Sequence, residues 1–148
     1  MDNIILQECL KLINKYNSFE KKARNYGTDK LLHPSEIHVI DAIGLNEEMT
    51  TTKIAEFLGI TKGGVSQITA KLIDKNLIQK TNGKGINEVY LSLTKEGKTA
   101  YHGHNKLHEH MLSKMNKLID KMDDTTRESL KNFICALNDE LIRLEGKE

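Results

Sequence analysis

The clearest signal for the fold of this chain is in residues 49–97, MTTTKIAEFLGITKGGVSQITAKLIDKNLIQKTNGKGINEVYLSLTKEG. Apolar residues recur at helical spacing over residues 52–58 and again over 61–75, and two strand-like runs follow at 77–81 and 88–93. The turn-forming segment Asn82-Gly83-Lys84-Gly85 joins the two runs into a hairpin. This order of elements predicts a winged helix-turn-helix, which presents one helix to the major groove of DNA.

Local signals support these boundaries. Gly59 follows the first helix and suits the left-handed position at which helices end. Thr61 is a good N-cap for the second helix, because its hydroxyl can accept a hydrogen bond from a free amide of the first turn. The first helix has an apolar face of Ile54, Ala55 and Leu58. The predicted buried stripe of the second helix consists of Val65, Ile68, Leu72 and Ile73.

The opposite face of the second helix is polar, and its side chains are of the kinds that read DNA. Gln67 can bond adenine in a bidentate way, Ser66 can meet a donor or an acceptor, and Lys62 suits guanine or phosphate. Glycines near the helix N-terminus allow a phosphate to approach the backbone amides. The residues predicted to contact DNA are Thr61, Lys62, Gly63, Gly64, Ser66, Gln67, Lys71, Lys80 and Lys84.

Charge agrees with this interpretation. Residues 61–85 contain five lysines and a single acidic residue, whereas the whole chain carries a formal net charge of only +1. A nearly neutral protein with a local basic patch can still bind DNA in a salt-dependent way. A solvated surface helix is the alternative reading of the same charges, so the charge supports the motif and does not replace it.

The flanks predict further helices and a mostly α fold of order α-α-α-α-β-β-α-α. A first helix is expected over residues 3–25, and Pro34 opens a second one that ends near Gly44. Thr94 caps a long helix to about residue 122, and an acidic, hydroxyl-rich turn at 123–126 caps the last helix. No apolar run of about 18 residues and no signal peptide is seen, so we expect a cytoplasmic protein without membrane contact.

We expect residues 1–148 to form a single domain with two parts. The winged lobe covers residues 33–97, and residues 1–30 and 98–148 form a helical dimerisation region. The terminal helices carry apolar stripes that need cover, and a second copy of the chain is the natural cover. A symmetric dimer would also place two reading helices on a palindromic site.

The chain resembles the MarR family of bacterial transcriptional regulators over nearly its whole length. The residues that carry the resemblance are Met49-Thr50, Ile54-Ala55-Glu56, Val65-Ser66-Gln67, Lys71-Leu72, Asn76-Leu77-Ile78 and the run from Leu91 to Gly97. The resemblance implies a homodimer built from the first and last two helices, and a regulator, usually a repressor, that responds to a small signal. The family's wing usually carries an Asp-x-Arg pair at its tip, where this chain has Lys84 between two glycines. Lysine is a point charge and reads groove width less well than arginine.

Four of the six histidines fall within nine residues, at positions 102, 104, 108 and 110. His104 and His108 are four residues apart, a spacing that forms half of many zinc sites. This chain resembles the family's zinc-uptake repressors, and that resemblance implies a zinc site formed by Glu20, His38, His104 and His108. Its fatty-acid-synthesis repressors resemble the run Glu36 to Gly44 equally well and respond to acyl chains on a carrier protein. Zinc, an acyl-carrier or small-molecule ligand, and hydrogen-bonded structural histidines therefore remain open alternatives, and no cofactor is required.

Other classes of function find less support. Cys9 and Cys135 lie on apolar helical stripes and are expected to be inert core thiols. The sequence shows no phosphate-binding glycine loop, nucleophile elbow or paired catalytic carboxylates, so we do not expect an enzyme. The alternative of another class is a winged helix that binds only proteins. The basic reading segment argues against it. We therefore predict a DNA-binding transcriptional regulator, with a zinc-dependent repressor of metal uptake as an alternative.

Overall fold

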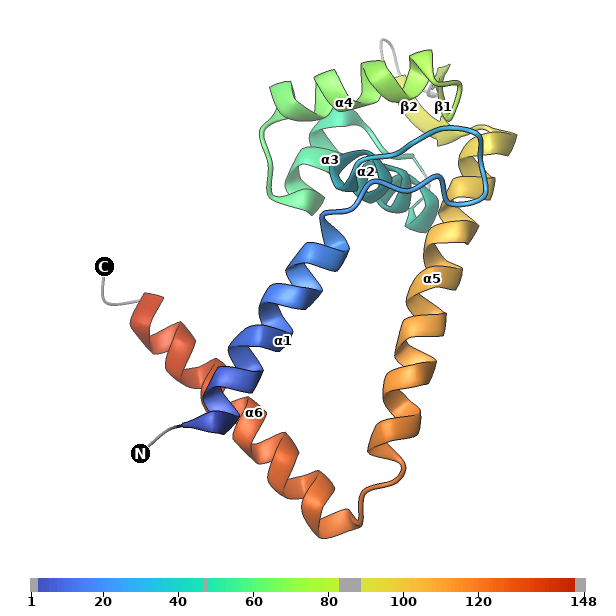
Figure 1. The fold of residues 1–148 in the computed structure, drawn as a ribbon. Helices are drawn as coiled ribbons and strands as arrows, with labels where there is room; N and C mark the ends of the chain where they lie inside the picture. The colour runs from blue at the N-terminus through green and yellow to red at the C-terminus, as the bar shows by residue number, and fades with distance from the viewer. Residues whose placement is uncertain (1–2, 47, 83–88, 146–148) are drawn as a thin grey trace. The chain divides into compact units, whose positions relative to one another are not determined.

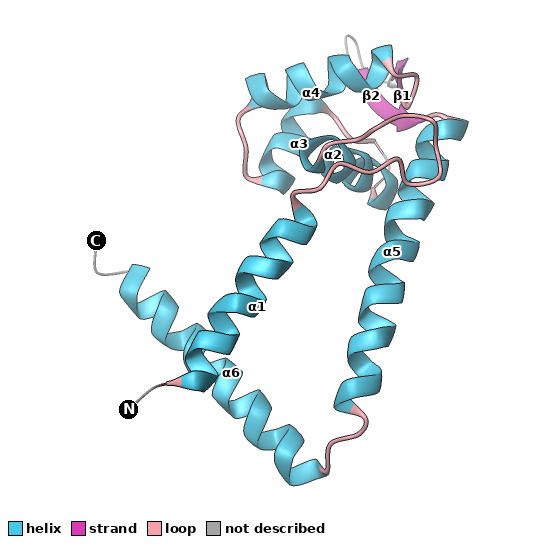
Figure 2. Cartoon of the chain, in the orientation of Figure 1, coloured by secondary structure: helices cyan, strands magenta, loops and turns pink. Residues whose placement is uncertain are grey.

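The computed structural model describes residues 3–46, 48–82 and 89–145. The elements follow the predicted order (Figures 1 and 2), namely α1 (Ile4–Glu20), α2 (Pro34–Leu45), α3 (Thr51–Leu58), α4 (Lys62–Asp74), β1 (Ile78–Asn82), β2 (Val89–Leu93), α5 (Lys95–Ile119) and α6 (Asp124–Glu145). The chain divides into two compact units, Met1–Lys106 and Leu107–Glu148, and the boundary falls within α5.

The helix-turn-helix is bounded by three caps, at Thr50, Gly59 and Thr61, of which Gly59 and Thr61 were predicted from the sequence. The Thr50 hydroxyl accepts a hydrogen bond from the Lys53 amide at 3.2 Å and starts α3. Gly59 ends α3 with φ of 66°, a left-handed conformation that is strained for residues with a side chain. Thr61 then accepts from the Gly64 amide at 3.1 Å and starts α4. These caps, formed by groups close together in the sequence, set where α3 begins and ends and where α4 begins.

Helix α2 is the centre of the lobe. It contacts α3, α4 and β2, and Figure 1 shows α2 and α3 packed beneath α4. Its fully buried side chains include Ile37, Val39 and Ile40, and Val65 and Leu72 of α4 are buried as completely. Burial of each such aliphatic side chain stabilises the fold by about 1.5–3 kcal/mol. The predicted stripe of α4 is therefore its core face, although Ile68 and Ile73 are only half-buried.

The hairpin is antiparallel, with Ile78 opposite Leu93 and Asn82 opposite Val89. Strand β2 is also joined to the segment before α3, because the Leu91 amide donates to the Met49 carbonyl at 2.8 Å. This bond connects the wing to the start of the helix-turn-helix. The predicted tip, with Lys84 and the first residue of the second run, lies outside the described residues.

The prediction that the first helix runs to residue 25 was wrong, because α1 ends at Glu20. Arg24 is engaged elsewhere: its backbone pairs with Leu32 in both directions, and its guanidinium donates to the Phe19 carbonyl at 2.8 Å. The same guanidinium lies 4.2 Å from the centre of the Phe19 ring. A long-range backbone pair and a cation–π contact therefore replace the last helical turn.

Two glycines of α5 allow the helix to approach other backbone closely. A Cβ on Gly97 would collide with the Leu77 carbonyl, and a Cβ on Gly103 would collide with the Tyr26 carbonyl. Tyr26 itself has a positive φ of 46°. The first part of α5 is therefore fitted to the chain segments on either side of the helix-turn-helix.

The terminal helices leave their apolar faces exposed in the single chain. No residue of α1 is buried, and Ile5 and Leu12 are 65% and 62% exposed. In α6, Ile134 and Leu141 are 56% and 60% exposed. The expectation that both cysteines are buried was wrong for this chain, because Cys135 is exposed and Cys9 only half-buried. None of the helices in the described ranges is long and apolar enough to cross a membrane.

Candidate nucleic-acid interface

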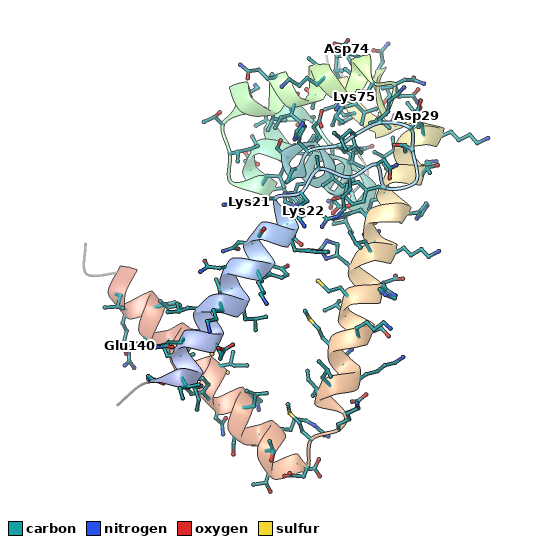
Figure 3. The ribbon with its side chains drawn as sticks, in the orientation of Figure 1. Lys21, Lys22, Asp29, Asp74, Lys75 and Glu140 are labelled. Carbon is teal, nitrogen blue, oxygen red and sulfur yellow. The ribbon has the colours of Figure 1, made fainter. Side chains whose placement is uncertain are left out.

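The polar face of α4 points away from the core. Lys62, Ser66, Gln67 and Lys71 are all exposed, and Figure 3 shows side chains projecting outward along α4 as far as Asp74. Since Val65 and Leu72 on the opposite face are buried, the polar face of α4 is fixed in direction. The structure therefore places these four predicted residues on one accessible surface.

The N-terminal turn of α4 is open to an approaching anion. A Cβ built on Gly63 meets nothing within 4 Å among the described residues, so no protein contact requires glycine there. A Cβ on Gly64 would lie 3.2 Å from the Thr61 hydroxyl oxygen. Thr61 already bonds the Gly64 amide, while amides of the first turn carry the positive end of the helix dipole. Gly63, at the start of this turn, is therefore exposed and is not covered by other parts of the described chain.

A groove of about 470 Å³ separates α4 from the hairpin and brings two predicted residues together. Ser66 of α4 and Lys80 of β1 both line it, along with Thr69 and Asp74. The Ser66 hydroxyl donates to the Lys62 carbonyl at 2.9 Å, which leaves its lone pairs as acceptors. Lys80 is exposed. Lys84, the last predicted contact, lies outside the described residues.

An anchor at the other end of α4 was not predicted from the sequence. Lys75 was counted as part of the basic reading segment, but its ammonium lies 2.6 Å from Glu36 Oε1 and 2.9 Å from the Leu31 carbonyl. Glu36 is buried, and its second oxygen accepts from the His33 amide at 2.8 Å. Figure 3 marks Lys75 where α4 ends. The charge of Lys75 is therefore balanced inside the protein, and Lys62, Lys71 and Lys80 supply the charge of the described surface.

Burial alone would raise the pKa of Glu36, but the bonds from Lys75 and the His33 amide outweigh it and hold the pKa below its usual value. Glu36 is therefore ionised at neutral pH and bonds the end of α4 to the start of α2. The capping position of Glu36 is readable from its place after Pro34. The ion pair between Glu36 and Lys75, 39 residues away, cannot be predicted from a single sequence.

The candidate metal ligands are only partly brought together. The rings of His38 and His104 lie 6.3 Å apart, and His104 Nδ1 is 2.6 Å from Asp41 Oδ2. His104 is buried, with the Tyr26 ring against it at 5.3 Å. Glu20 is half-buried at the end of α1, and His108 belongs to the second compact unit. Within the described ranges, no group of three or more His, Cys, Asp or Glu side chains is placed to hold a metal ion.

Comparison with known proteins gives a consistent result. Residues 32–85 match the MarR family. The chain is 31% identical over 110 residues to the HTH-type transcriptional regulator PchR of Bacillus subtilis, covering 72% of this chain and 64% of that protein. It is 35% identical over 85 residues to the uncharacterized HTH-type transcriptional regulator YhjH of the same organism, covering 57% and 49%. The chain thus spans about half to just under two-thirds of the length of these relatives.

Solved structures share the fold over nearly the whole chain. A zinc-responsive MarR family member, ZitR of Lactococcus lactis, superposes with a TM-score of 0.75 at 24% identity, covering 92% of this chain and 96% of that one. FabT of Streptococcus pneumoniae in complex with DNA superposes with a TM-score of 0.71 at 24% identity, covering 95% and 96%. ZitR in complex with DNA gives 0.74 at 23% identity, covering 92% and 97%.

Proposed function

The chain belongs to the MarR family through residues 32–85 and through its fold, and on that premise we propose that it is a sequence-specific DNA-binding regulator of transcription. The observation that carries the proposal is the exposed polar face of α4, fixed outward by a buried apolar face and started by an open, Thr-capped turn. The groove shared by Ser66 and Lys80 then joins this face to the wing.

The residues of this surface divide between two kinds of DNA contact in this proposal. Lys62, Ser66 and Gln67 approach base edges from α4. Lys71, Lys80 and the wing residue Lys84 contact phosphates, and so does the backbone of Gly63 and Gly64 beyond the Thr61 cap. The contacts to bases specify the sequence, whereas the contacts to phosphates position the helix and make binding sensitive to salt.

We propose that the regulator acts as a homodimer on a palindromic operator. The support is the apolar surface that the single chain leaves exposed on α1 and α6, where no residue is buried among those described. Exposed patches of this extent mark interaction surfaces, and a two-fold axis matches two half-sites one DNA turn apart. In this division residues 33–97 form the DNA-binding lobe, and 1–30 and 98–148 form the dimerisation region.

The proposed physiological role is repression in the cytoplasm, relieved or enabled by a signal. A small organic molecule or an acyl chain on a carrier protein is the signal we favour. Neither repression nor the response to such a signal requires a cofactor in this proposal.

Zinc is the second candidate signal, with Glu20, His38, His104 and His108 as its donor set. Two observations favour it: His38 lies beside His104, and a carboxylate contacts His104 Nδ1. A carboxylate in that position orients many metal-binding histidines. Zinc bound there would supply charge and a rigid connection between ligands.

DNA binding by fluorescence anisotropy tests the proposal. The full chain is titrated onto labelled duplex from its gene's own upstream region, and onto a scrambled duplex of equal composition, at several salt concentrations. Tighter binding to the upstream duplex, weakening steeply with salt, supports the regulator. Absence of binding to either duplex would instead support the protein-interaction alternative. Added zinc and a chelator, run in parallel, separate zinc from an organic signal.

A further inference from the structure

A single acidic residue, Asp74, lies on the surface that we propose meets DNA. It is the last residue of α4, and residues 61–85 contain five lysines but no other acid. Its side chain is exposed and lines the groove of about 470 Å³ between α4 and the hairpin, together with Ser66 and Lys80. Figure 3 marks it at the end of the helix. A carboxylate in this place repels the phosphates of any DNA that enters the groove.

The fold of the free protein does not account for this carboxylate. In the described parts of the chain, the Asp74 side chain has no hydrogen-bond or ion-pair partner. The last turn of a helix also carries the negative end of the helix dipole, where an acidic side chain is unfavourable. Residues that break a local rule without a compensating contact are often residues that serve function. We therefore looked for the role of Asp74 in binding rather than in folding.

The lysines near Asp74 do not neutralise its charge. Lys75 follows it directly, but the Lys75 ammonium lies 2.6 Å from Glu36 Oε1 and is balanced by that buried carboxylate. Lys71 precedes it by about one helical turn and Lys80 lines the same groove. Neither of these two forms an ion pair with Asp74 within the described ranges. The C-terminal end of α4 therefore keeps an uncompensated negative charge.

The two ends of α4 consequently carry opposite charge. At the N-terminal end, the exposed Lys62 and the open turn at Gly63 add to the positive end of the helix dipole. At the C-terminal end, Asp74 adds to the negative end of the dipole. The helix has 13 residues, so the two ends are roughly 20 Å apart. Phosphates are therefore favoured beside the first turn of α4 and disfavoured beside its last turn.

We propose that Asp74 is a specificity-determining residue that weakens binding to DNA of the wrong sequence. Such DNA lacks the base contacts of α4, so it is held mainly through phosphates and the protein samples several orientations on it. In some of these orientations Asp74 meets a phosphate. On the correct sequence, base contacts hold α4 in one orientation that keeps Asp74 off the backbone. Repulsion directed against wrong partners is a general source of specificity. This inference rests on the proposed function.

Anisotropy titrations of the full chain with upstream and scrambled duplexes test the role of Asp74. Asp74→Asn should tighten binding to the scrambled duplex by about two- to fivefold, the range expected for one charge pair at a solvated site. Its binding to the upstream duplex should stay nearly unchanged, and the gain should shrink as salt rises. Asp74→Glu keeps the charge and should behave as the wild type does. Glu109→Gln removes the same charge from an exposed position in the second compact unit and should change neither affinity.

Equal tightening on both duplexes, or no change on either, would overturn the inference, because the charge would then carry no sequence information. Weaker binding of Asp74→Asn to the upstream duplex would also overturn it and indicate a base contact, since a carboxylate can accept from cytosine.

Urea unfolding of the same variants separates a structural role from a role in selectivity. Asp74→Asn should be at least as stable as the wild type, and a clear loss of stability would contradict the claim that the fold gains nothing from this carboxylate. A wild type that binds neither duplex would refute the proposed function and this inference together. A wild type and an Asp74→Asn variant that prefer the upstream duplex equally would refute the inference alone.

Discussion

Replacement of Lys75 by methionine isolates the anchor of the reading helix. The substitution keeps most of the apolar stem and removes the ammonium that bonds Glu36 at 2.6 Å. The Glu36 side chain is 5% exposed and would remain as a buried carboxylate with only the His33 amide as a partner. Removing one member of a buried pair costs about 3–5 kcal/mol. Because Lys75 is 29% exposed and water reaches its position, we expect the lower end, about 3 kcal/mol.

Thermal and urea unfolding at equal protein concentration measure this loss. A change of about 3 kcal/mol corresponds to a fall in Tm of roughly 6–12 °C for a chain of this size. Lys71→Met is the matched control, since Lys71 is exposed on the same helix and its loss should change the free energy of unfolding by less than about 0.5 kcal/mol. The two variants should also differ in the cause of any change in DNA binding. Lys71→Met should weaken binding directly, whereas Lys75→Met should weaken it only by lowering the fraction of folded protein.

The pH dependence of the free energy of unfolding is a second test of the Lys75–Glu36 pair, because it follows the direction of the Glu36 pKa shift. The pKa of Glu36 is lowered in the folded protein, so its contribution to stability is present above the unfolded value of about 4.5 and is lost as the pH falls through the folded value. In Lys75→Met burial would dominate and raise that pKa instead. The difference in stability between wild type and variant should therefore be largest near pH 7. It should shrink as the pH falls, first through the raised Glu36 pKa of the variant and then through the lowered Glu36 pKa of the wild type. Equal stabilities at pH 7, or a difference that grows in acid, would refute the reasoning.

Four further outcomes are expected. Gly103→Ala places a Cβ against the Tyr26 carbonyl and should lower the free energy of unfolding by about 1–3 kcal/mol in urea titrations. Gln67→Ala should lose about 1–3 kcal/mol of discrimination at one base pair, measured with a set of single-base duplex variants. Lys80→Ala should weaken binding to all duplexes alike and reduce the salt slope by about 0.9 in a log–log plot. Ile134→Glu, on the exposed face of α6, should shift the chain toward monomer in sedimentation velocity. An unchanged dimer would remove α6 from the proposed interface.

The parts of the fold that the sequence predicts well depend on neighbouring residues. Gly59 and Thr61 each act within one helical turn, so their caps and the resulting boundaries are readable without any tertiary contact. The same holds for the start of α2 at Pro34. The polar face of α4 follows from helical periodicity, and its exposure was therefore predictable.

The parts that were missed depend on distant residues. Arg24 is not helical because its backbone pairs with Leu32, and no local propensity encodes that pair. Lys75 looks like a solvated lysine in the sequence, yet it neutralises a carboxylate 39 positions earlier. The His104–Asp41 contact between α5 and α2 is of the same kind.

Competition anisotropy measures directly whether α4 reads a DNA sequence. Wild type and Gln67→Ala are each bound to labelled upstream duplex and displaced by unlabelled upstream or scrambled duplex, at one fixed salt concentration. We expect the wild type to prefer its own duplex, and Gln67→Ala to lose part of this preference while keeping its affinity for scrambled DNA. Equal displacement of the wild type by both duplexes would show that α4 does not read the sequence.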